Sequence, residues 1–248
     1  MLTDLPAGLH TAGMQSGNKF SKYLLYAVGE IILVVIGILI ALQINNWNEE
    51  RKLKSVEIKI LKDLKNDIQE NIGNLNEGIK QMEISNADIS KVLLMYEQKT
   101  PYNDSLLPAF SVFMGQWDPD FTYAGFENLK NLGVNIISNK TLRKEIIKLN
   151  EVEMDILDNS DMSRIDQMNL VMVLPMMKKY FFRDLNYEDE SLPLIPSNYQ
   201  TMINDPEFYN VCTEIAFRQK RSIIRFSNFN KTANNLISEI DSEIQFLE

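Results

Sequence analysis

Few side chains in this chain could perform nucleophilic or metal chemistry. Its 248 residues include a single histidine, His10, and a single cysteine, Cys212. A zinc site built from His and Cys needs three or four such ligands, so one chain cannot form it. A Ser–His or Cys–His pair would have to use His10, which lies in a polar, glycine-containing segment. Because the sequence also lacks a glycine-rich phosphate loop and a paired acidic motif with metal-loop spacing, we expect no enzymatic activity, no cofactor and no metal.

The charge balance argues against a nucleic-acid partner. The chain has 34 acidic and 25 basic residues, a formal net charge of -9 and a sequence pI of about 4.8. Binding to nucleic acid requires a basic face that can neutralise phosphates. We therefore expect no nucleic-acid partner.

A carboxylate within an apolar run is the most informative polar group in the chain. From Tyr23 to Ile44 the strongly polar side chains are Glu30 and Gln43. About fourteen Leu, Ile and Val residues in this run contribute roughly -6 kcal/mol to membrane insertion, whereas one central charge costs about +3 kcal/mol. Insertion is therefore favoured despite Glu30, and we predict a single transmembrane anchor over residues 22–47.

Aromatic residues flank the predicted anchor at both ends. Tyr23 and Tyr26 lie at its start and Trp47 at its end, as in the aromatic belts of the membrane interface. Two alternatives are a buried core helix, which is rarely so long and apolar, and a cleaved signal peptide. Residues 40–43 offer no small-x-small cleavage site, so we expect an uncleaved anchor.

Glu30 shares one helical face with two small residues. Steps of three and four place the following residues on one stripe: Ala27, Glu30, Val34, Gly37, Ala41 and Ile44. Gly37 and Ala41 form a small-xxx-small pair, which lets two helix backbones approach closely. One hypothesis is a helix–helix contact through Glu30, Val34, Gly37 and Ala41, with Glu30 hydrogen-bonded across the interface. The alternative is a lipid-facing Glu30, protonated or snorkelling, beside an incidental Gly37.

The anchor region resembles a bacterial family of single-anchor membrane proteins that is known only as a domain of unknown function. The resemblance rests on KYLLYA-GE, VVIGILIAL and INNWNE, which here occupy residues 22–30, 34–42 and 44–49. A second stretch over residues 122–146 is also similar to the family pattern. The resemblance implies a short tail, one anchor and an external domain, and it implies no activity.

The charges flanking the anchor leave its orientation open. Lys19 and Lys22 precede the run, and Arg51, Lys52 and Lys54 follow it. The positive-inside rule taken alone favours a cytoplasmic C-terminal side, but long domains translocate largely regardless of charge. Following the architecture that the resemblance implies, we expect a single-pass protein of the bacterial cytoplasmic (inner) membrane with its C-terminal domain in the periplasm.

Beyond the anchor, apolar residues recur in steps of three and four, which predicts helices. We expect an all-α protein in which a short polar tail over residues 1–21 precedes the anchor. The anchor continues into a long stalk helix at about 48–97. Shorter helices follow at about 121–185, and a C-terminal helix at about 205–248 packs antiparallel on the stalk in a helical bundle. Residues 48–248 thus form a helical extramembrane domain.

Four aromatic residues gather in one short stretch of that domain: Trp117, Phe121, Tyr123 and Phe126. They form a candidate partner or ligand surface, and core packing is the alternative reading. As a function we expect a membrane-anchored scaffold or interaction module, with the lipid bilayer, a second copy or another membrane protein as partner. The alternative is a ligand-binding sensor ectodomain that signals through a membrane partner.

Overall fold

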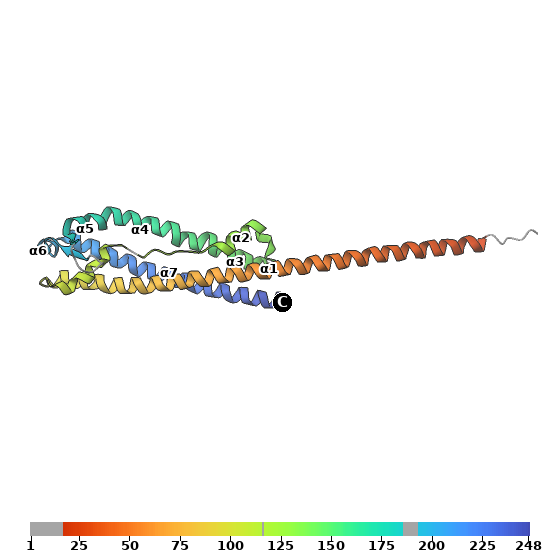
Figure 1. Cartoon of the computed structure of the whole chain (residues 1–248), viewed down its shortest axis with the longest axis horizontal. Helices are drawn as coiled ribbons and strands as arrows, with labels where there is room; N and C mark the ends of the chain where they lie inside the picture. The colour runs from red at the N-terminus through yellow and green to blue at the C-terminus, as the bar shows by residue number, and fades with distance from the viewer. Residues whose placement is uncertain (1–16, 116, 186–192) are drawn as a thin grey trace, which may run out of the picture. The chain divides into compact units, whose positions relative to one another are not determined.

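The computed structural model describes residues 17–115, 117–185 and 193–248 (Figure 1). The chain divides into two compact units, Met1–Ser55 and Val56–Glu248. Helix α1 runs from Gly17 to Gln98 and therefore contributes residues to both units. Most of the described chain is helical, which confirms the predicted all-α class. The predicted polar tail lies largely outside the described residues.

In the first unit the described residues belong to α1. An 18-residue window within this helix has a mean hydropathy of 2.7, and none of the window is buried. By length and composition, α1 is the one described helix that could cross a membrane. The guanidinium of Arg51 lies 5.6 Å from the ring centroid of Trp47, where the apolar residues give way to charged ones.

In the second unit, α1 is followed by short helical segments, a small sheet and one further long helix. In chain order the elements are η1 (Asp104–Phe113), α2 (Ala124–Leu132), η2 (Val134–Ile136), α3 (Lys140–Lys148), η3 (Leu149–Glu153), η4 (Ile156–Asp161), α4 (Met162–Met168), η5 (Asn169–Val173), α5 (Leu174–Tyr180), β1 (Phe181–Arg183), β2 (Leu194–Pro196), α6 (Tyr199–Met202) and α7 (Pro206–Leu247). Segments η1 and η2 are 3₁₀ helices, whereas η3, η4 and η5 are π-helical. Strands β1 and β2 pair antiparallel, with Phe181 opposite Pro196.

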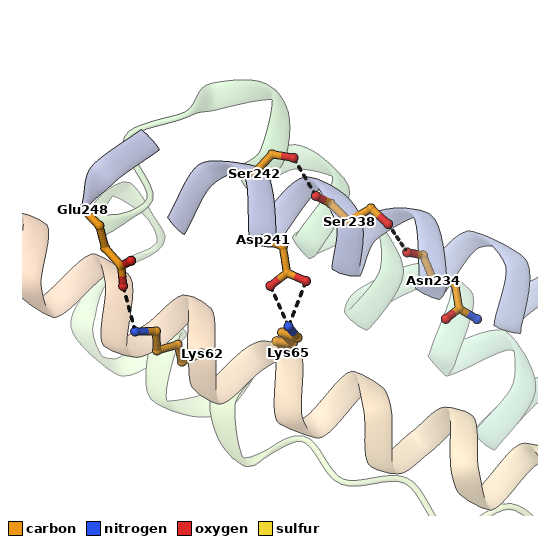
Figure 2. A network of polar contacts seen from close by, with 7 residues as sticks. All are labelled: Lys62, Lys65, Asn234, Ser238, Asp241, Ser242 and Glu248. Atoms are coloured by element: carbon orange, nitrogen blue, oxygen red, sulfur yellow. Dashed lines mark hydrogen bonds and ion pairs between the residues drawn. The ribbon is translucent and has the colours of Figure 1, made fainter. Parts of the chain in front are cut away.

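Within the second unit α7 lies beside α1 and runs in the opposite direction (Figure 1). Lys65 Nζ contacts both carboxylate oxygens of Asp241, at 2.6 and 2.8 Å (Figure 2). Thirty-two residues further along α1, Glu97 accepts a hydrogen bond of 3.0 Å from Tyr209, which lies thirty-two residues before Asp241 on α7. The two helices therefore keep one register over this length. Exposed ion pairs contribute little to stability, so these contacts mark the register, and the apolar cores between the helices stabilise it.

Two separate hydrophobic cores lie along the α1–α7 pair. Core A consists of buried apolar side chains from the stretches 60–82 of α1 and 226–247 of α7, together with side chains of α2, α3 and η3. Core B consists of buried apolar side chains from the stretches 89–95 of α1 and 208–215 of α7, together with side chains of η1, α5, α6 and the small sheet. Each fully buried Leu, Ile or Phe stabilises the fold by about 1.5–3 kcal/mol relative to exposure. The interval between the cores contains no fully buried apolar residue in either long helix.

Candidate functional site

The interval between the two cores is a polar seam, which we define as Ser85 and Asn86 of α1 and Arg218, Gln219 and Ser222 of α7. Arg218, Gln219 and Ser222 are each more than 90% buried. Gln219 Nε2 donates to Ser85 Oγ at 2.5 Å, which joins the two long helices across the seam. The seam is therefore a buried polar layer between apolar layers.

Several polar atoms of this seam are buried but lack a partner. Within the described residues, no hydrogen-bond partner lies near Asn86 Oδ1, Arg218 Nε or Gln219 Oε1. A buried polar group without a partner costs about 1–3 kcal/mol, and a charged one costs more. Native proteins keep few such groups, so three in one layer mark the seam as a candidate binding site.

Arg218 is the charged member of the seam, and its side chain is buried. Its Nη1 donates to Asn169 Oδ1 at 3.4 Å, which is a weak hydrogen bond. Burial lowers the pKa of the Arg218 guanidinium, and the nearby Glu214 carboxylate acts in the opposite direction. An arginine nevertheless stays charged at neutral pH. The seam therefore contains one positive charge that is only partly compensated.

A pocket of about 210 Å³ opens at this charge. We call it the seam pocket. Arg218, Gln219 and Asn169 contribute its polar groups, and the end of η1, segment η5 and helix α5 contribute apolar walls. Ile215 of α7 completes the lining next to Arg218. A mostly apolar cavity with a few convergent polar groups is the usual form of a small-molecule site.

Two further recesses share residues with the seam pocket. One, of about 100 Å³, is lined by Arg218 together with Arg164, Arg221 and Arg225, and by Phe217 and Glu214. The other, of about 420 Å³, shares Gln219 and Gly115 with the seam pocket and reaches Trp117. The seam pocket thus adjoins an arginine-rich recess and a recess that includes Trp117.

The aromatic residues that the sequence suggested as a surface lie against core A. Phe126 is 2% exposed and belongs to that core, whereas Trp117, Phe121 and Tyr123 are half-buried against it. Trp117 makes an edge contact with Phe226, with ring centroids 5.8 Å apart. A partner surface through Trp117, Phe121 and Tyr123 stays a prediction, and Phe126 serves as core.

Tyr123 also belongs to a polar contact beside these aromatic residues. Its hydroxyl donates to Asp158 at 3.0 Å. Burial, followed by Asp158, raises the pKa of the Tyr123 phenol. Among the residues that the structure describes, no group of three His, Cys, Asp or Glu side chains is placed to hold a metal ion.

The predicted anchor contact lies on the exposed surface of α1. Glu30, Val34, Gly37 and Ala41 are all exposed in the single chain. A Cβ added at Gly37 would meet no atom within 4 Å among the described residues. Tyr23, Tyr26 and Trp47 are 74%, 78% and 62% exposed. The described part of the chain therefore leaves this stripe open, and the predicted helix–helix contact stays a prediction.

The seam pocket itself was not predicted from the sequence. One local signal did exist, because Arg218, Gln219 and Ser222 follow the buried Ile215 by three, four and seven positions on α7. These positions face the core of an amphipathic helix, so charged and amide side chains there are unusual. Asn169, which accepts a hydrogen bond from Arg218, lies 49 residues away from it in sequence, and no local pattern connects these two residues.

Comparison with known protein families gave a match that concerns α1. The searches of curated proteins and of solved structures found no match. The family model that matches bears the description "Family of unknown function (DUF6090)". Its matched range includes Glu30, Gly37 and Ala41 and excludes Arg218. The match confirms the predicted resemblance to a domain of unknown function: residues 30–100, which cover most of α1, are similar to the family DUF6090.

Proposed function

We propose that this chain is a single-pass membrane protein whose helical second unit is an interaction module, and that copies associate through the anchor. The observation that carries the proposal is the exposed apolar part of α1. Its most apolar window is unburied within the chain, and side chains such as Ile31 and Leu33 are 63% and 71% exposed. Contiguous exposed apolar surface on this scale marks an interaction site, and a helix of this length and hydropathy fits a bilayer.

Membrane insertion has a direct test. After expression of the full chain in bacteria, membranes are washed with alkaline carbonate, and the pellet and supernatant are compared. An inserted helix stays in the pellet because its apolar side chains leave lipid only at a cost of many kcal/mol. Recovery of the chain in the supernatant would rule out the anchor. An alkaline phosphatase fusion after Glu248 reports the side of the membrane, and we expect it to be active in the periplasm of the bacterial cell.

Association through the anchor is tested by two matched glycine substitutions. Gly37 lies on the Glu30 stripe, whereas Gly29 lies on a different face of the same helix, and a Cβ at either position meets no described atom within 4 Å. Gly37→Leu should therefore disturb no contact within the chain but should block close approach of a second helix. We expect crosslinked dimer to fall for Gly37→Leu and to persist for Gly29→Leu. Equal dimer yields for the two variants would contradict the proposed interface.

Glu30 is tested in the same assay. Interhelical hydrogen bonds within membranes are worth about 0.6 kcal/mol on average and up to about 1.7, so Glu30→Leu should weaken association roughly three- to fifteen-fold. Unchanged association would assign Glu30 to a lipid-facing role.

A second candidate function is a ligand-binding sensor domain that signals through a membrane partner. The observation in its favour is the seam pocket, where Arg218, Gln219 and Asn169 converge beside apolar walls. A solid core would have favoured the interaction module alone. The two proposals are compatible, because the anchor lies in the first unit and the pocket in the second.

A further inference from the structure

We propose that the seam pocket binds a small organic monocarboxylate with an apolar body, whose carboxylate pairs with Arg218. The inference rests on the second candidate function, since it names the ligand class of that site, and it is independent of the membrane anchor. Four observations support it: the buried charge of Arg218, the basic side chains beside it, the volume of the pocket and the π-helical segment that lines it.

The charge indicates a single negative group on the ligand. Arg218 is 9% exposed, its Nε has no partner among the described residues, and it is the one charged side chain that lines the described pocket. A planar guanidinium presents a fork of donors that matches a carboxylate. One buried cation is balanced by one negative charge, which favours a carboxylate over a phosphate dianion.

The charges around Arg218 also favour an anion. The adjoining arginine-rich recess adds Arg164, Arg221 and Arg225, and Glu214 is the one acidic residue in its lining. Although the whole chain is acidic, the lining of this recess contains four arginines and one glutamate. Basic side chains beside a binding site raise the local concentration of anionic ligands.

The volume sets the size of the apolar body. An apolar cavity of about 150 Å³ in another protein holds benzene, and the seam pocket measures about 210 Å³. A phenyl ring with a short side chain therefore fits. The walls that would contact it are Val112, Phe113, Leu170, Val173, Leu174 and Met177. Met177 can adapt to the ring, because an unbranched thioether side chain repacks easily.

The pocket is shaped by a π-helical turn. Segment η5 is π-helical, and it supplies Asn169, Leu170 and Val173 to the lining. Such a turn breaks the regular spacing of a helix, and short π segments occur frequently at functional sites. Here it places Asn169 beside Arg218 and the two apolar side chains on the wall of the same cavity.

Calorimetric titration of the full chain in neutral phosphatidylcholine nanodiscs tests the inference. Nanodiscs avoid detergent monomers, which could themselves occupy the pocket. The titrants are phenylpropionate, its uncharged analogue phenylpropionamide, acetate and phenyl phosphate. We expect one phenylpropionate to bind per chain. The amide and acetate should bind roughly tenfold more weakly or worse, since each lacks either the charge or the apolar body.

Two pairs of variants locate the binding. Arg218→Gln removes the positive charge of the pocket, and Lys220→Gln removes a positive charge at an exposed position nearby. Leu170→Glu places a carboxylate on the pocket wall, and Val171→Glu places one just outside the lining. Leu170 and Val171 are 66% and 68% exposed, so neither change should unfold the chain. We expect roughly tenfold or greater loss of affinity for the first member of each pair and none for the second.

Absence of phenylpropionate binding, or equal binding of the amide, would overturn the inference. Tighter binding of phenyl phosphate would overturn the assignment of a monocarboxylate. If Arg218→Gln fails to fold, as circular dichroism would reveal, Leu170→Glu carries the test, and wild-type affinity in that variant overturns the site. None of these outcomes affects the carbonate test, so failure of the ligand site and failure of the anchor are distinguishable.

Discussion

Two glycines of α1 should respond in opposite ways to the same substitution. Gly73 is exposed, and a Cβ there meets no described atom within 4 Å, whereas a Cβ at Gly78 would overlap with ring carbons of Trp117. Alanine in a helix is favoured over glycine by about 1 kcal/mol. Gly73→Ala should therefore stabilise the fold by up to about 1 kcal/mol.

Gly78→Ala gains the same propensity but must displace the ring of Trp117. A fully buried tryptophan buries about 200 Å², so a displacement that exposes half of this area, about 100 Å², costs about 2.5 kcal/mol. The displaced ring also loses its edge contact with Phe226. The net effect of Gly78→Ala is a destabilisation of about 1.5 kcal/mol, and the two variants should differ by about 2.5 kcal/mol.

Thermal unfolding and tryptophan fluorescence in nanodiscs measure both parts of this prediction. A change of 1 kcal/mol shifts Tm by about 2–4 °C in a chain of this size, so Gly78→Ala should lower Tm by about 3–6 °C and Gly73→Ala should raise it by about 2–4 °C. With Trp47 replaced by Phe, emission reports Trp117 alone and should shift to longer wavelength for Gly78→Ala. If both variants raise Tm equally and emission is unchanged, the ring does not lie on Gly78.

Three further predictions concern single side chains of the second unit. Asn71 is 1% exposed, and it donates to the Thr122 carbonyl and accepts from the Thr122 N–H. Chemical denaturation should therefore show that Asn71→Ala lowers the free energy of unfolding by about 2–4 kcal/mol. A loss under about 1 kcal/mol would show that this pairing is dispensable. Hydrogen bonding from Lys179 is the largest of the effects that lower the pKa of Asp205 to about 2, from 3.8. Ionised Asp205 therefore stabilises the fold above about pH 4, and this contribution is lost as the pH falls through about 2. Asp205→Ala should cost about 1–2 kcal/mol near neutral pH and less below pH 2, where a neutral carboxyl still caps α7, as acid titrations of stability would show. Cys212 is 1% exposed, and burial raises the pKa of its thiol. A thiol reagent at pH 8 should therefore label it only in denaturant. Rapid labelling of the folded chain would contradict its placement in core B.

The long helices could be predicted because their causes are local. The steps of three and four in α1 and α7 reflect one buried face each, and the Asp205–Pro206 pair starts α7 as a cap and first-turn proline do elsewhere. The apolar run around Glu30 is also a local property. Each of these features follows from residues that are neighbours in sequence.

The shorter helices over about 121–185 were expected from the sequence, but the two strands and the π-helical segments were not. Strands β1 and β2 are three residues each, too short for an alternating pattern to appear. The π-helical segments η3 and η5 contribute Leu149 to core A and Val173 to core B, which are contacts that no local pattern shows. The position of Trp117 depends on the space above Gly78, which lies far from it in sequence. For the same reason a surface of four aromatic residues could not be told from a core contact.

The energetics of the seam explain why a bound ligand is a better account of it than stability. Apolar residues that replace a buried polar layer are often neutral or stabilising, because desolvation offsets most of what buried charges contribute. Cores A and B already join α1 to α7 on both sides of Arg218 and Gln219, so the fold does not require polar groups between them. A layer that leaves Arg218 Nε and Gln219 Oε1 without partners among the described residues costs stability. A ligand that pairs with Arg218 removes part of that cost on binding, which makes the seam a place where binding energy and folding energy are coupled.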